Sequence, residues 1–404
     1  MRFAIRDVEL SQPLQAIDLA PEEVGIALIG RWQERLVGFR MVRAEGRRSI
    51  SAEALTAIAD EAFAMPVLTA IIEREQPRPP SRALPTLTLA ICTKDRAVRL
   101  ARLLATLVEV RDRSPFAATE ILVIDNAPSD DSTREVAASH AGVRYVTEPK
   151  AGLNFARNTA LANATGDLLA FLDDDVVVDR HYLEGLAAAW RSAPEAGGFT
   201  GLVLPYRLET EAQICFEERG GFGRGFARRE FQATSFAFPL HPAGAGLLGA
   251  GCNMAFDRAL LLQLGGFDDA LDTGRPLPGG GDLDIFYRVL RAGRTMVYEP
   301  RYAVFHEHRE TVEQLRHQYW TWGLGLMAFL VKSWRTDREW RPQHRALVRW
   351  WLLDQLKSVA GAAARLRPRD LRFRLAEFAG GIQGLFGEYD RSQRRVAAIR
   401  DRLS

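Results

Sequence analysis

The sequence of 404 residues predicts an α/β protein with three successive parts: a small leading module, a domain built on a parallel sheet, and a helical segment. Strand-like apolar runs alternate with helical patterns between residues 83 and 310, which is typical of a parallel sheet covered by helices. Prolines at positions 77, 79, 80 and 85 mark an extended linker ahead of this domain, because clustered prolines oppose helix formation and stiffen the chain. We therefore expect the chain to divide into residues 1–82, 83–310 and 311–404.

The individual elements follow from local hydrophobic patterns. Up to about Arg43 short apolar runs mix with turns, and residues 52–75 then have a helical pattern. From Thr311 onwards the pattern is strongly helical and rich in tryptophan and arginine. The elements expected in the central domain are strand 87–92, helix 97–110, strand 120–125, helix 132–139, strand 143–147, helix 154–164, strand 167–172 and helix 181–191.

Composition argues against several classes of protein. The three cysteines, Cys92, Cys215 and Cys252, have no C-x-x-C spacing, so we expect neither a disulfide framework nor a cysteine zinc site. The formal charge of +2 is too near neutrality to indicate a nucleic-acid partner. The first residues lack the apolar core of a signal peptide, and no run reaches the ~20 uninterrupted apolar residues of a membrane span. We expect a cytoplasmic protein, soluble or peripheral at the inner face of the membrane.

Three consecutive aspartates, Asp173, Asp174 and Asp175, follow the apolar run 168–172. Such a charge cluster at the end of a buried strand is costly unless a cation is bound, and Mg²⁺ takes carboxylate oxygens together with the phosphates of a substrate. A solvated acidic turn is the alternative. In parallel sheets, ligands bind beyond the carboxyl ends of the strands, so we expect the aspartates, residues 93–96 and Asp125 to converge on one cleft.

Several motifs occur in an order that resembles the inverting, nucleotide-sugar-dependent glycosyltransferases of family 2, which have the GT-A fold. The resemblance covers roughly Leu84 to Arg309. It is carried by Ile-Cys-Thr-Lys-Asp-Arg at 91–96, Val-Ile-Asp-Asn-Ala-Pro-Ser-Asp-Asp-Ser-Thr at 123–133, Gly-Leu-Asn-Phe-Ala-Arg-Asn at 152–158, Phe-Leu-Asp-Asp-Asp at 171–175, Gly-Gly-Phe-Asp at 265–268 and Gly-Gly-Asp-Leu-Asp at 280–284. It implies a GT-A, Rossmann-like domain of the nucleotide-diphospho-sugar transferase type.

The resemblance also implies roles for residues that bind the donor. Asp125 would accept a hydrogen bond from the imide N–H of a uracil-type base, although an aspartate can instead cap the following turn. Arg157 would bind ribose or phosphate oxygens, with a surface ion pair as the alternative. Asp174 stands at the X position of an Asp-X-Asp motif, where alternation would point it to the opposite face if the strand extends that far. The remaining residues assigned to the nucleotide or donor are Thr93, Asp95, Arg96, Asp173 and, with a role toward donor sugar or acceptor, Asn253.

The metal and its ligands are implied in the same way. In the family, the first aspartate of Asp-X-Asp, here Asp173, meets the ribose or the metal shell, and the last, here Asp175, ligates Mn²⁺ or Mg²⁺. His306 matches a histidine that reaches the metal or the diphosphate. His306 and His308 could also suggest a zinc pair, but no further ligand spacing supports zinc.

The base that takes the proton of the acceptor hydroxyl is assigned to Asp282 by the resemblance, with Asp284 as the fallback. Gly281 departs from the family pattern, because an acidic residue often stands there. Asp282 could alternatively cap the helix expected at 285–291.

Together these features predict a metal-dependent inverting transferase that uses a nucleotide-diphosphate sugar, most simply a UDP-sugar, and a hydroxyl acceptor of a polysaccharide, glycolipid or other glycoconjugate. A sugar nucleotidyltransferase is one rival, although residues 92–96 lack the glycine-rich loop expected after its first strand. A noncatalytic nucleotide-sugar-binding module is another, kept open by Gly281. The tryptophans and arginines of the C-terminal segment suit a membrane boundary and a lipid-linked acceptor. They would equally suit a core between helices or a homodimer contact.

Overall fold

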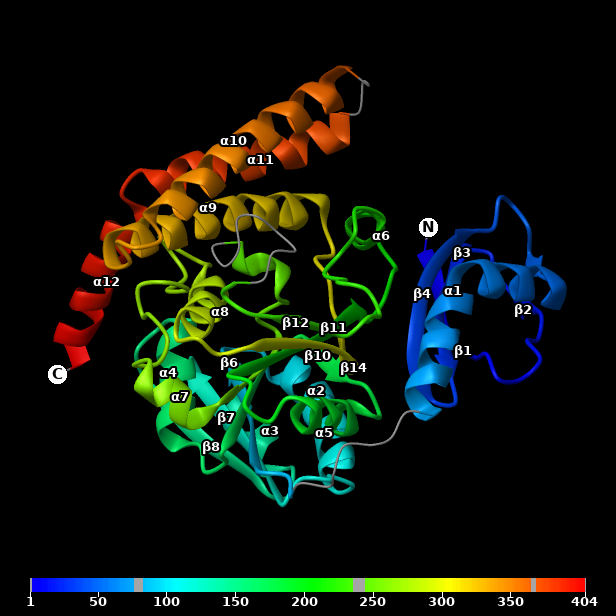
Figure 1. Cartoon of the computed structure of the whole chain (residues 1–404), viewed down its shortest axis with the longest axis horizontal. Coiled ribbons are helices and arrows are strands. Elements are labelled where there is room, and N and C mark those ends of the chain that lie inside the picture. Colours follow the sequence, from blue (N-terminus) through cyan, green and yellow to red (C-terminus); the bar gives the residue numbers. More distant parts are fainter. Residues whose placement is uncertain (1, 76–82, 235–243, 365–367, 404) are drawn as a thin grey trace.

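The computed structural model describes residues 2–75, 83–234, 244–364 and 368–403 (Figure 1). Three of the four prolines of the expected linker, at positions 77, 79 and 80, lie outside the described residues. The described chain forms a central sheet covered by helices, a separate N-terminal sheet with one long helix, and a layer of C-terminal helices. The predicted α/β class is therefore confirmed.

The central sheet has the strand order β10-β14-β11-β13-β9-β6-β7-β8, with β12 paired to β14. The four strands β9, β6, β7 and β8 are mutually parallel, as expected. β13 lies antiparallel between β9 and β11, so the sheet is mixed and not purely parallel. The strands are β6 (Thr86–Thr93), β7 (Ala118–Asn126), β8 (Val143–Glu148), β9 (Leu168–Asp173), β10 (Val176–Val178), β11 (Gly198–Pro205), β12 (Arg229–Phe231), β13 (Asn253–Asp257) and β14 (Met296–His306).

Helices cover both faces of this sheet because its strands are apolar on both sides. Ile91 and Val123 pack in one core with Leu100 of α2 and Leu186 of α5. Their strand neighbours form a second core with α4, α7 and α8 on the opposite face. The helices of this part are α2 (Ala97–Arg111), α3 (Ser132–Ala138), α4 (Leu153–Asn163), α5 (Tyr182–Ser192), α6 (Glu211–Glu218), α7 (Arg258–Gln263) and α8 (Gly281–Arg291), with a short 3₁₀ turn at Ala245–Leu247.

The N-terminal module is a three-stranded sheet of order β1-β3-β4 under a single long helix, α1. The ring of Phe63 in α1 lies directly on the backbone of Gly30 and Gly38, where a Cβ would come within 3.0 Å of it. α1 is the one helix among the described residues with the length and composition of a membrane span, and it leaves Met65 and Leu68 exposed. The elements are β1 (Arg2–Glu9), β2 (Ile17–Asp18), β3 (Glu23–Trp32), β4 (Arg35–Arg43), β5 (Ser49–Ile50) and α1 (Ala52–Glu75).

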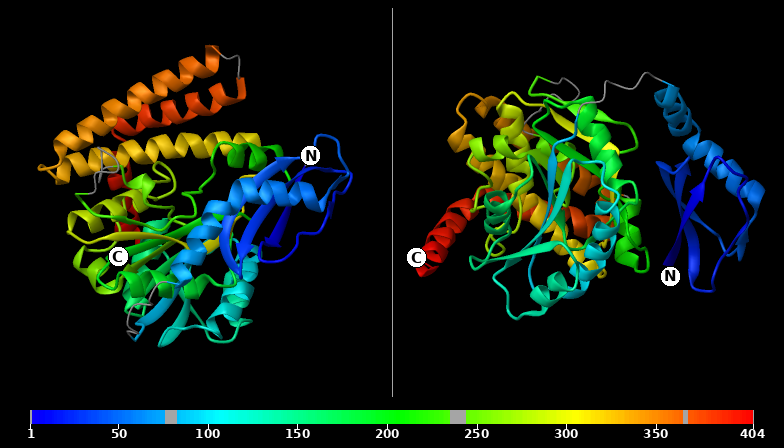
Figure 2. Two further views of the ribbon diagram at one scale, coloured as in Figure 1. Left: turned by 45° about the vertical axis from the view of Figure 1, so that its right-hand side comes forward. Right: turned by 90° about the horizontal axis from the view of Figure 1, so that it is seen from below.

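A buried ion pair joins this module to the central domain, and the right view of Figure 2 shows the module beside that domain. Arg31 of β3 donates to Asp179 with an Nη2–Oδ2 distance of 2.5 Å and to Asp7 with an Nε–Oδ2 distance of 2.7 Å. The side chains of Arg31 and Asp179 are only 3% and 2% exposed. The pair therefore fixes one surface against the other.

We expect Arg31→Met to lower the free energy of unfolding by about 3 kcal/mol, because it leaves the buried Asp179 carboxylate without its cation. Urea denaturation followed by circular dichroism measures this loss. Arg40→Met is the matched control, since Arg40 lies in β4 of the same sheet, is 55% exposed and is 3.9 Å from Glu61 of α1. Equal losses in the two variants would contradict the assigned role of the ion pair.

The C-terminal helices stack on one another and on the central domain (Figure 1). α9 and α11 approach closely at glycines: a Cβ at Gly323 would lie 2.0 Å from the Glu377 carbonyl oxygen, and one at Gly380 would lie 2.0 Å from that of Trp320. Of the tryptophans, Trp351 is buried in the core between helices, whereas Trp350 is 46% exposed, and neither a membrane nor a dimer contact is tested by this. The helices are α9 (Val312–Thr336), α10 (Arg341–Ala364), α11 (Pro368–Leu385) and α12 (Glu388–Leu403).

Candidate active site

Two adjoining cavities open at the carboxyl ends of β6, β7 and β9, where the polar strand ends were expected to meet. One has a volume of about 660 Å³ and is lined by residues that include 92–96 and Asn126. The other has a volume of about 570 Å³ and is lined by residues that include Asp282, His306 and residues of α9. Asp173 and Asp175 line both cavities, so the aspartate cluster lies at their junction.

Asp174 ties two of the predicted donor-binding residues together. Its Oδ2 accepts from Thr93 Oγ at 2.7 Å, and its Oδ1 accepts from Arg96 Nη1 at 2.9 Å. Burial raises the pKa of the Asp174 carboxyl, and the charge of Arg96 opposes that rise. With both carboxylate oxygens engaged, Asp174 serves to order the loop after β6.

Asp173 and Asp175 offer their carboxylates to the cavity. The Asp173 side chain is 38% exposed toward the cavity, yet the protein atoms packed around its carboxyl group, together with the Asp175 charge, raise the pKa of that group. Asp175 Oδ1 is buried and has no hydrogen-bond partner among the described residues, and His306 Nε2 lies 3.4 Å from it. An uncompensated buried carboxylate oxygen costs free energy, which a bound cation would recover.

The described residues contain no group of three or more His, Cys, Asp or Glu side chains arranged to hold a metal ion by themselves. This does not argue against Mg²⁺ or Mn²⁺ bound with substrate, because Mg²⁺ is commonly held by one or two carboxylates, with waters and substrate phosphates in the other positions. The predicted ligands fit that kind of site.

Asp125, at the end of β7, is fully buried and lines neither cavity, although its neighbour Asn126 lines the first, so its expected place in the cleft is not borne out. Its Oδ2 accepts from the Tyr145 hydroxyl at 2.7 Å, whereas its Oδ1 has no hydrogen-bond partner within the described ranges. Burial raises the pKa of the Asp125 carboxyl. Asp95 differs, because its carboxylate accepts from the backbone N–H and hydroxyl of Ser129 at 2.9 and 2.8 Å and so holds the neighbouring loop.

Arg157 lies in α4 and is 4% exposed between several acidic groups. Its Nη1 donates to Asp272 Oδ2 at 3.3 Å, and its Nη2 is 4.0 Å from Asp173 Oδ1. Sequence reasoning missed Asp272, which lines both cavities and whose pKa burial raises to about 6. A Cβ at residue 281 would lie 2.2 Å from Asp272 Oδ2, so Asp272 explains why the chain has Gly281 there.

Asp282 stands in the first turn of α8 and faces the second cavity. Its Oδ1 accepts from the backbone N–H of Leu283 at 2.9 Å. Its Oδ2 borders Gly251, where a Cβ would lie 3.2 Å away. The turn before it rests on α9: Gly280 has a φ of +98°, and a Cβ there would lie 2.7 Å from the carbonyl oxygen of Gly325.

Asp284, the fallback candidate, is fully buried and paired. Its carboxylate contacts Lys332 Nζ and accepts from Arg288 Nε at 2.8 Å. Two cations on a buried carboxylate leave no free oxygen directed at the cavity. The geometry therefore favours Asp282.

Two further expectations need correction. Asn253 does not line either cavity, because its amide donates to the carbonyl oxygens of Tyr302 at 2.9 Å and Leu202 at 3.3 Å within the sheet. Strand alternation turns it away while the preceding Cys252 lines the second cavity. His308 is directed at protein groups, since its two ring nitrogens face His306 and Glu217, which agrees with the argument against a zinc pair.

Comparison with known proteins agrees with this geometry. Residues 88–232 match the family model described as glycosyl transferase family 2, and residues 168–368 match glycosyl transferase family group 2. A pre-mycofactocin glycosyltransferase of Mycobacterium tuberculosis is 27% identical over 302 residues, which are 74% of this chain and 54% of that protein. The succinoglycan biosynthesis protein ExoM of Rhizobium meliloti is 29% identical over 52% of this chain and 63% of its own length. The chain thus spans little more than half the length of these relatives.

Among solved structures, a mannosyltransferase of Pyrobaculum calidifontis, in complex with GDP-Man and Mn²⁺, superposes with a TM-score of 0.51 at 17% identity. The superposition covers 79% of this chain and 93% of that one. The present chain, with its parallel-rich sheet and the aspartate cluster at the strand ends, has the GT-A fold of glycosyltransferases. The chain belongs to glycosyltransferase family 2.

Proposed function

We propose that this chain transfers a sugar from a nucleotide-diphosphate sugar to a hydroxyl group with inversion at the anomeric carbon. The observation that carries the proposal is the shared cavity lined by Asp282, Asp173 and Asp175. A carboxylate that could act as a general base and two that could bind a cation line this one space, which supports the proposed transfer. The names of the mycobacterial and rhizobial relatives support sugar transfer in glycoconjugate synthesis.

A divalent cation fits the open side of this site. Asp173, Asp175 and His306 would hold it, and the uncompensated Asp175 Oδ1 is the structural reason. The cation would neutralise charge on the leaving diphosphate. The GDP-Man and Mn²⁺ complex of the mannosyltransferase supports such dependence, and we propose Mn²⁺ or Mg²⁺ here.

We base the choice of nucleotide on the chemistry of Asp125, which is buried next to the cavity-lining Asn126. Tyr145 occupies Asp125 Oδ2, so one oxygen remains to accept from a nucleobase. Uracil offers one imide N–H there, whereas guanine offers two adjacent donors, which suit a carboxylate with both oxygens free. We therefore propose a UDP-sugar as donor.

In the proposed reaction the acceptor oxygen attacks the anomeric carbon as Asp282 takes its proton. The bond between that carbon and the diphosphate oxygen breaks, and the electron pair leaves with the diphosphate. Arg157 supplies positive charge beside Asp173 while remaining anchored by Asp272. A single displacement of this kind inverts the configuration.

A donor panel tests the function. The purified protein would be incubated with Mn²⁺ and UDP-, GDP- and dTDP-sugars, and both binding and released nucleotide diphosphate would be measured. Release from a UDP-sugar is the expected result. Release from a GDP-sugar alone would overturn the base assignment, and binding without release from any donor, even with a range of hydroxyl acceptors, would indicate a noncatalytic binding module.

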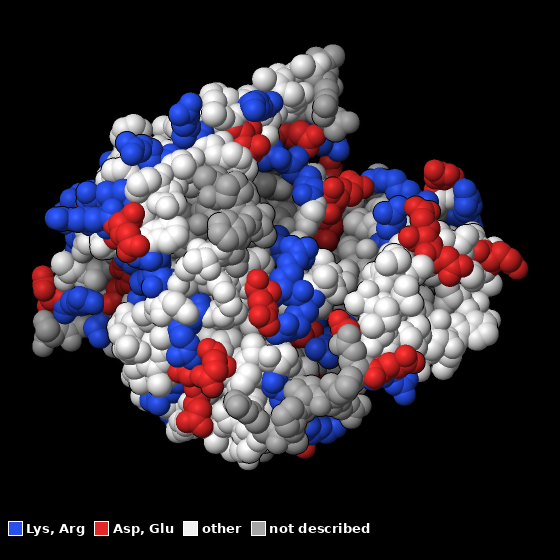
Figure 3. All heavy atoms as spheres, in the orientation of Figure 1, with Lys and Arg blue, Asp and Glu red and all other residues white. Residues whose placement is uncertain are grey.

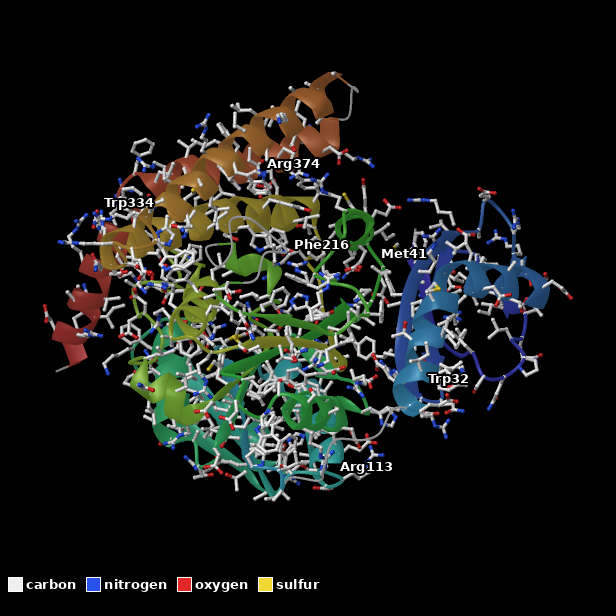
Figure 4. All side chains as sticks on the ribbon, viewed as in Figure 1. Trp32, Met41, Arg113, Phe216, Trp334 and Arg374 are labelled. Atoms are coloured by element: carbon white, nitrogen blue, oxygen red, sulfur yellow. The ribbon has the colours of Figure 1, made fainter. Side chains whose placement is uncertain are left out.

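We also propose that α10 contacts an anionic membrane surface, which would bring a lipid-linked acceptor close to the enzyme. Trp350, Leu353 and Leu356 are 46%, 48% and 55% exposed on this helix, and Arg345 and Arg349 are exposed among them. An apolar groove of about 460 Å³ between α9 and α10 adjoins this face. Basic side chains lie among uncharged ones along the upper edge in Figure 3, and Trp334 lies near the end of α9 in Figure 4.

This contact predicts sedimentation with phosphatidylglycerol vesicles and much weaker sedimentation with phosphatidylcholine vesicles. We expect Arg345→Gln with Arg349→Gln to weaken binding roughly tenfold or more, since each basic residue near an anionic surface contributes about 1 kcal/mol. Arg40→Gln with Arg47→Gln removes the same charge from the N-terminal module and is the control. Unchanged binding of the first variant would refute the contact, and a dimer dissociated by Trp350→Ala would assign this face to a second copy.

A further inference from the structure

A continuous row of side chains leads from the aspartate cluster to α6. His306 Nε2 lies 3.4 Å from Asp175 Oδ1, and His306 Nδ1 lies 3.0 Å from His308 Nδ1. The other nitrogen of His308, Nε2, lies 2.7 Å from Oε1 of Glu217. All four side chains are at most 8% exposed, so water has little access to the row.

Counting protons along this row decides which atoms are donors. An ionised carboxylate can only accept, so the 2.7 Å contact places the proton of a neutral His308 on Nε2. His308 Nδ1 is then an acceptor, and at 3.0 Å it must receive the proton of His306 Nδ1. His306 Nε2 is left with a bare lone pair.

The opposite arrangement is less favourable. If His306 carried its proton on Nε2 and donated to Asp175, then His308 would donate from Nδ1 and turn a lone pair toward Glu217. Two acceptors would then meet at 2.7 Å, closer than the 3.4 Å that separates His306 Nε2 from Asp175. Two facing acceptors repel each other more strongly at the shorter distance, so the proton is more stable between His308 and Glu217.

We propose that Glu217 and His308 are positioning residues that hold His306 as the Nδ1–H tautomer, so that its Nε2 lone pair and Asp175 Oδ1 are both directed at a divalent cation. This inference rests on the proposed function for the presence of the cation. Glu217, the last member of the row that supports His306, thus lies on α6, well separated in sequence from the Asp-X-Asp motif. Neither Glu217 nor His308 needs to touch substrate.

Neighbouring residues hold the side chains of this row in position. The ring of Phe216 lies edge-on to His308 at 4.8 Å, and that of Phe222 lies edge-on to His306 at 5.0 Å. Figure 4 labels Phe216 beside α6, on the side of the central domain. Gly221 has a φ of +51°, and a Cβ there would lie 2.3 Å from Glu217 Oε1, so the glycine leaves room for the carboxylate.

Nitrogen NMR on the metal-free full chain tests the tautomer directly. The protein has seven histidines, and selective ¹⁵N-histidine labelling with His306→Asn for assignment resolves the ring of interest. We expect a protonated Nδ1 and an unprotonated Nε2 in His306. A protonated His306 Nε2, or a doubly protonated His308, would overturn the proposal.

Metal affinity tests the consequence. Mn²⁺ binding, followed by electron paramagnetic resonance with whichever of UDP and GDP the wild type binds, should weaken about 10- to 100-fold in Glu217→Gln. Glu218→Gln is the matched control, because it removes the same charge from the next, 44% exposed position of α6. Equal affinity of Glu217→Gln and wild type would overturn the positioning role. A wild type that binds no Mn²⁺ would instead overturn the proposed metal dependence, and the NMR result would still decide the tautomer.

Discussion

Asp282→Asn is expected to reduce sugar transfer by at least about 100-fold while leaving donor affinity close to that of the wild type. The substitution removes the oxygen that takes the acceptor proton, and general base catalysis contributes about 10²- to 10⁴-fold. The asparagine oxygen can still accept from the Leu283 backbone N–H, so the first turn of α8 should remain folded. Initial rates of nucleotide diphosphate release and calorimetric titration with donor measure the two quantities.

Asp112→Asn is the control for this variant, because Asp112 lies at the end of α2 with its side chain 63% exposed. Its rate should equal that of the wild type. Full transfer activity in Asp282→Asn would show that another group takes the proton. Asp284 is a poor substitute while Lys332 and Arg288 hold it.

Asp175→Ala is expected to abolish metal-dependent nucleotide binding. The backbone carbonyl of Asp175 still accepts from Glu307 N–H at 2.8 Å, so the loop after β9 keeps its connection to β14. The variant therefore removes the proposed metal ligand with little change of fold. Nucleotide affinity is measured by calorimetric titration, once with Mn²⁺ and once with a chelator. The two affinities should differ strongly for the wild type and be equal for the variant.

Asp174→Asn is the control for this variant, because it removes one negative charge from the same motif without removing a proposed metal ligand. It leaves Asp173 and Asp175 in place and disturbs only the contacts with Thr93 and Arg96. We expect metal-dependent binding to persist in that variant. Unchanged calorimetric affinity of Asp175→Ala with Mn²⁺ would contradict the assignment of Asp175 as a ligand.

Local patterns predicted the elements of the first half of the domain well. Strand 87–92 corresponds to β6 (Thr86–Thr93) and helix 97–110 to α2 (Ala97–Arg111), because alternation and helical periodicity are local properties. The onset of helix at Thr311 is also confirmed, since Thr311 caps α9 with its hydroxyl. The antiparallel placement of β13 between β9 and β11 was not predicted, because strand order depends on contacts distant in sequence.

The site shows the same division. The order of the motifs predicted that the aspartate cluster and Asp282 lie in one region. The pairing of Asp125 with Tyr145 was not predicted, because it depends on the register of β7 and β8. Asp272 was missed because it lies in a loop without periodicity. Its only local signal was its place between two glycine-rich motifs. Asn253 was misassigned because one strand position decides which face a side chain meets.

The contact between Gly280 and Gly325 has a consequence for how this protein can diversify. The turn that presents Asp282 rests on the backbone of α9, with no side chain between them. A shortened chain ending at residue 310 would keep the motifs from 91–96 to 280–284 and lose the support beneath Asp282, the proposed general base. Exchange of the C-terminal helices between relatives, an obvious route to new acceptors, must therefore preserve a small residue at this crossing. α9 is therefore part of the support of the catalytic domain, and α11 is tied to α9 in turn by the glycine contacts between the two helices.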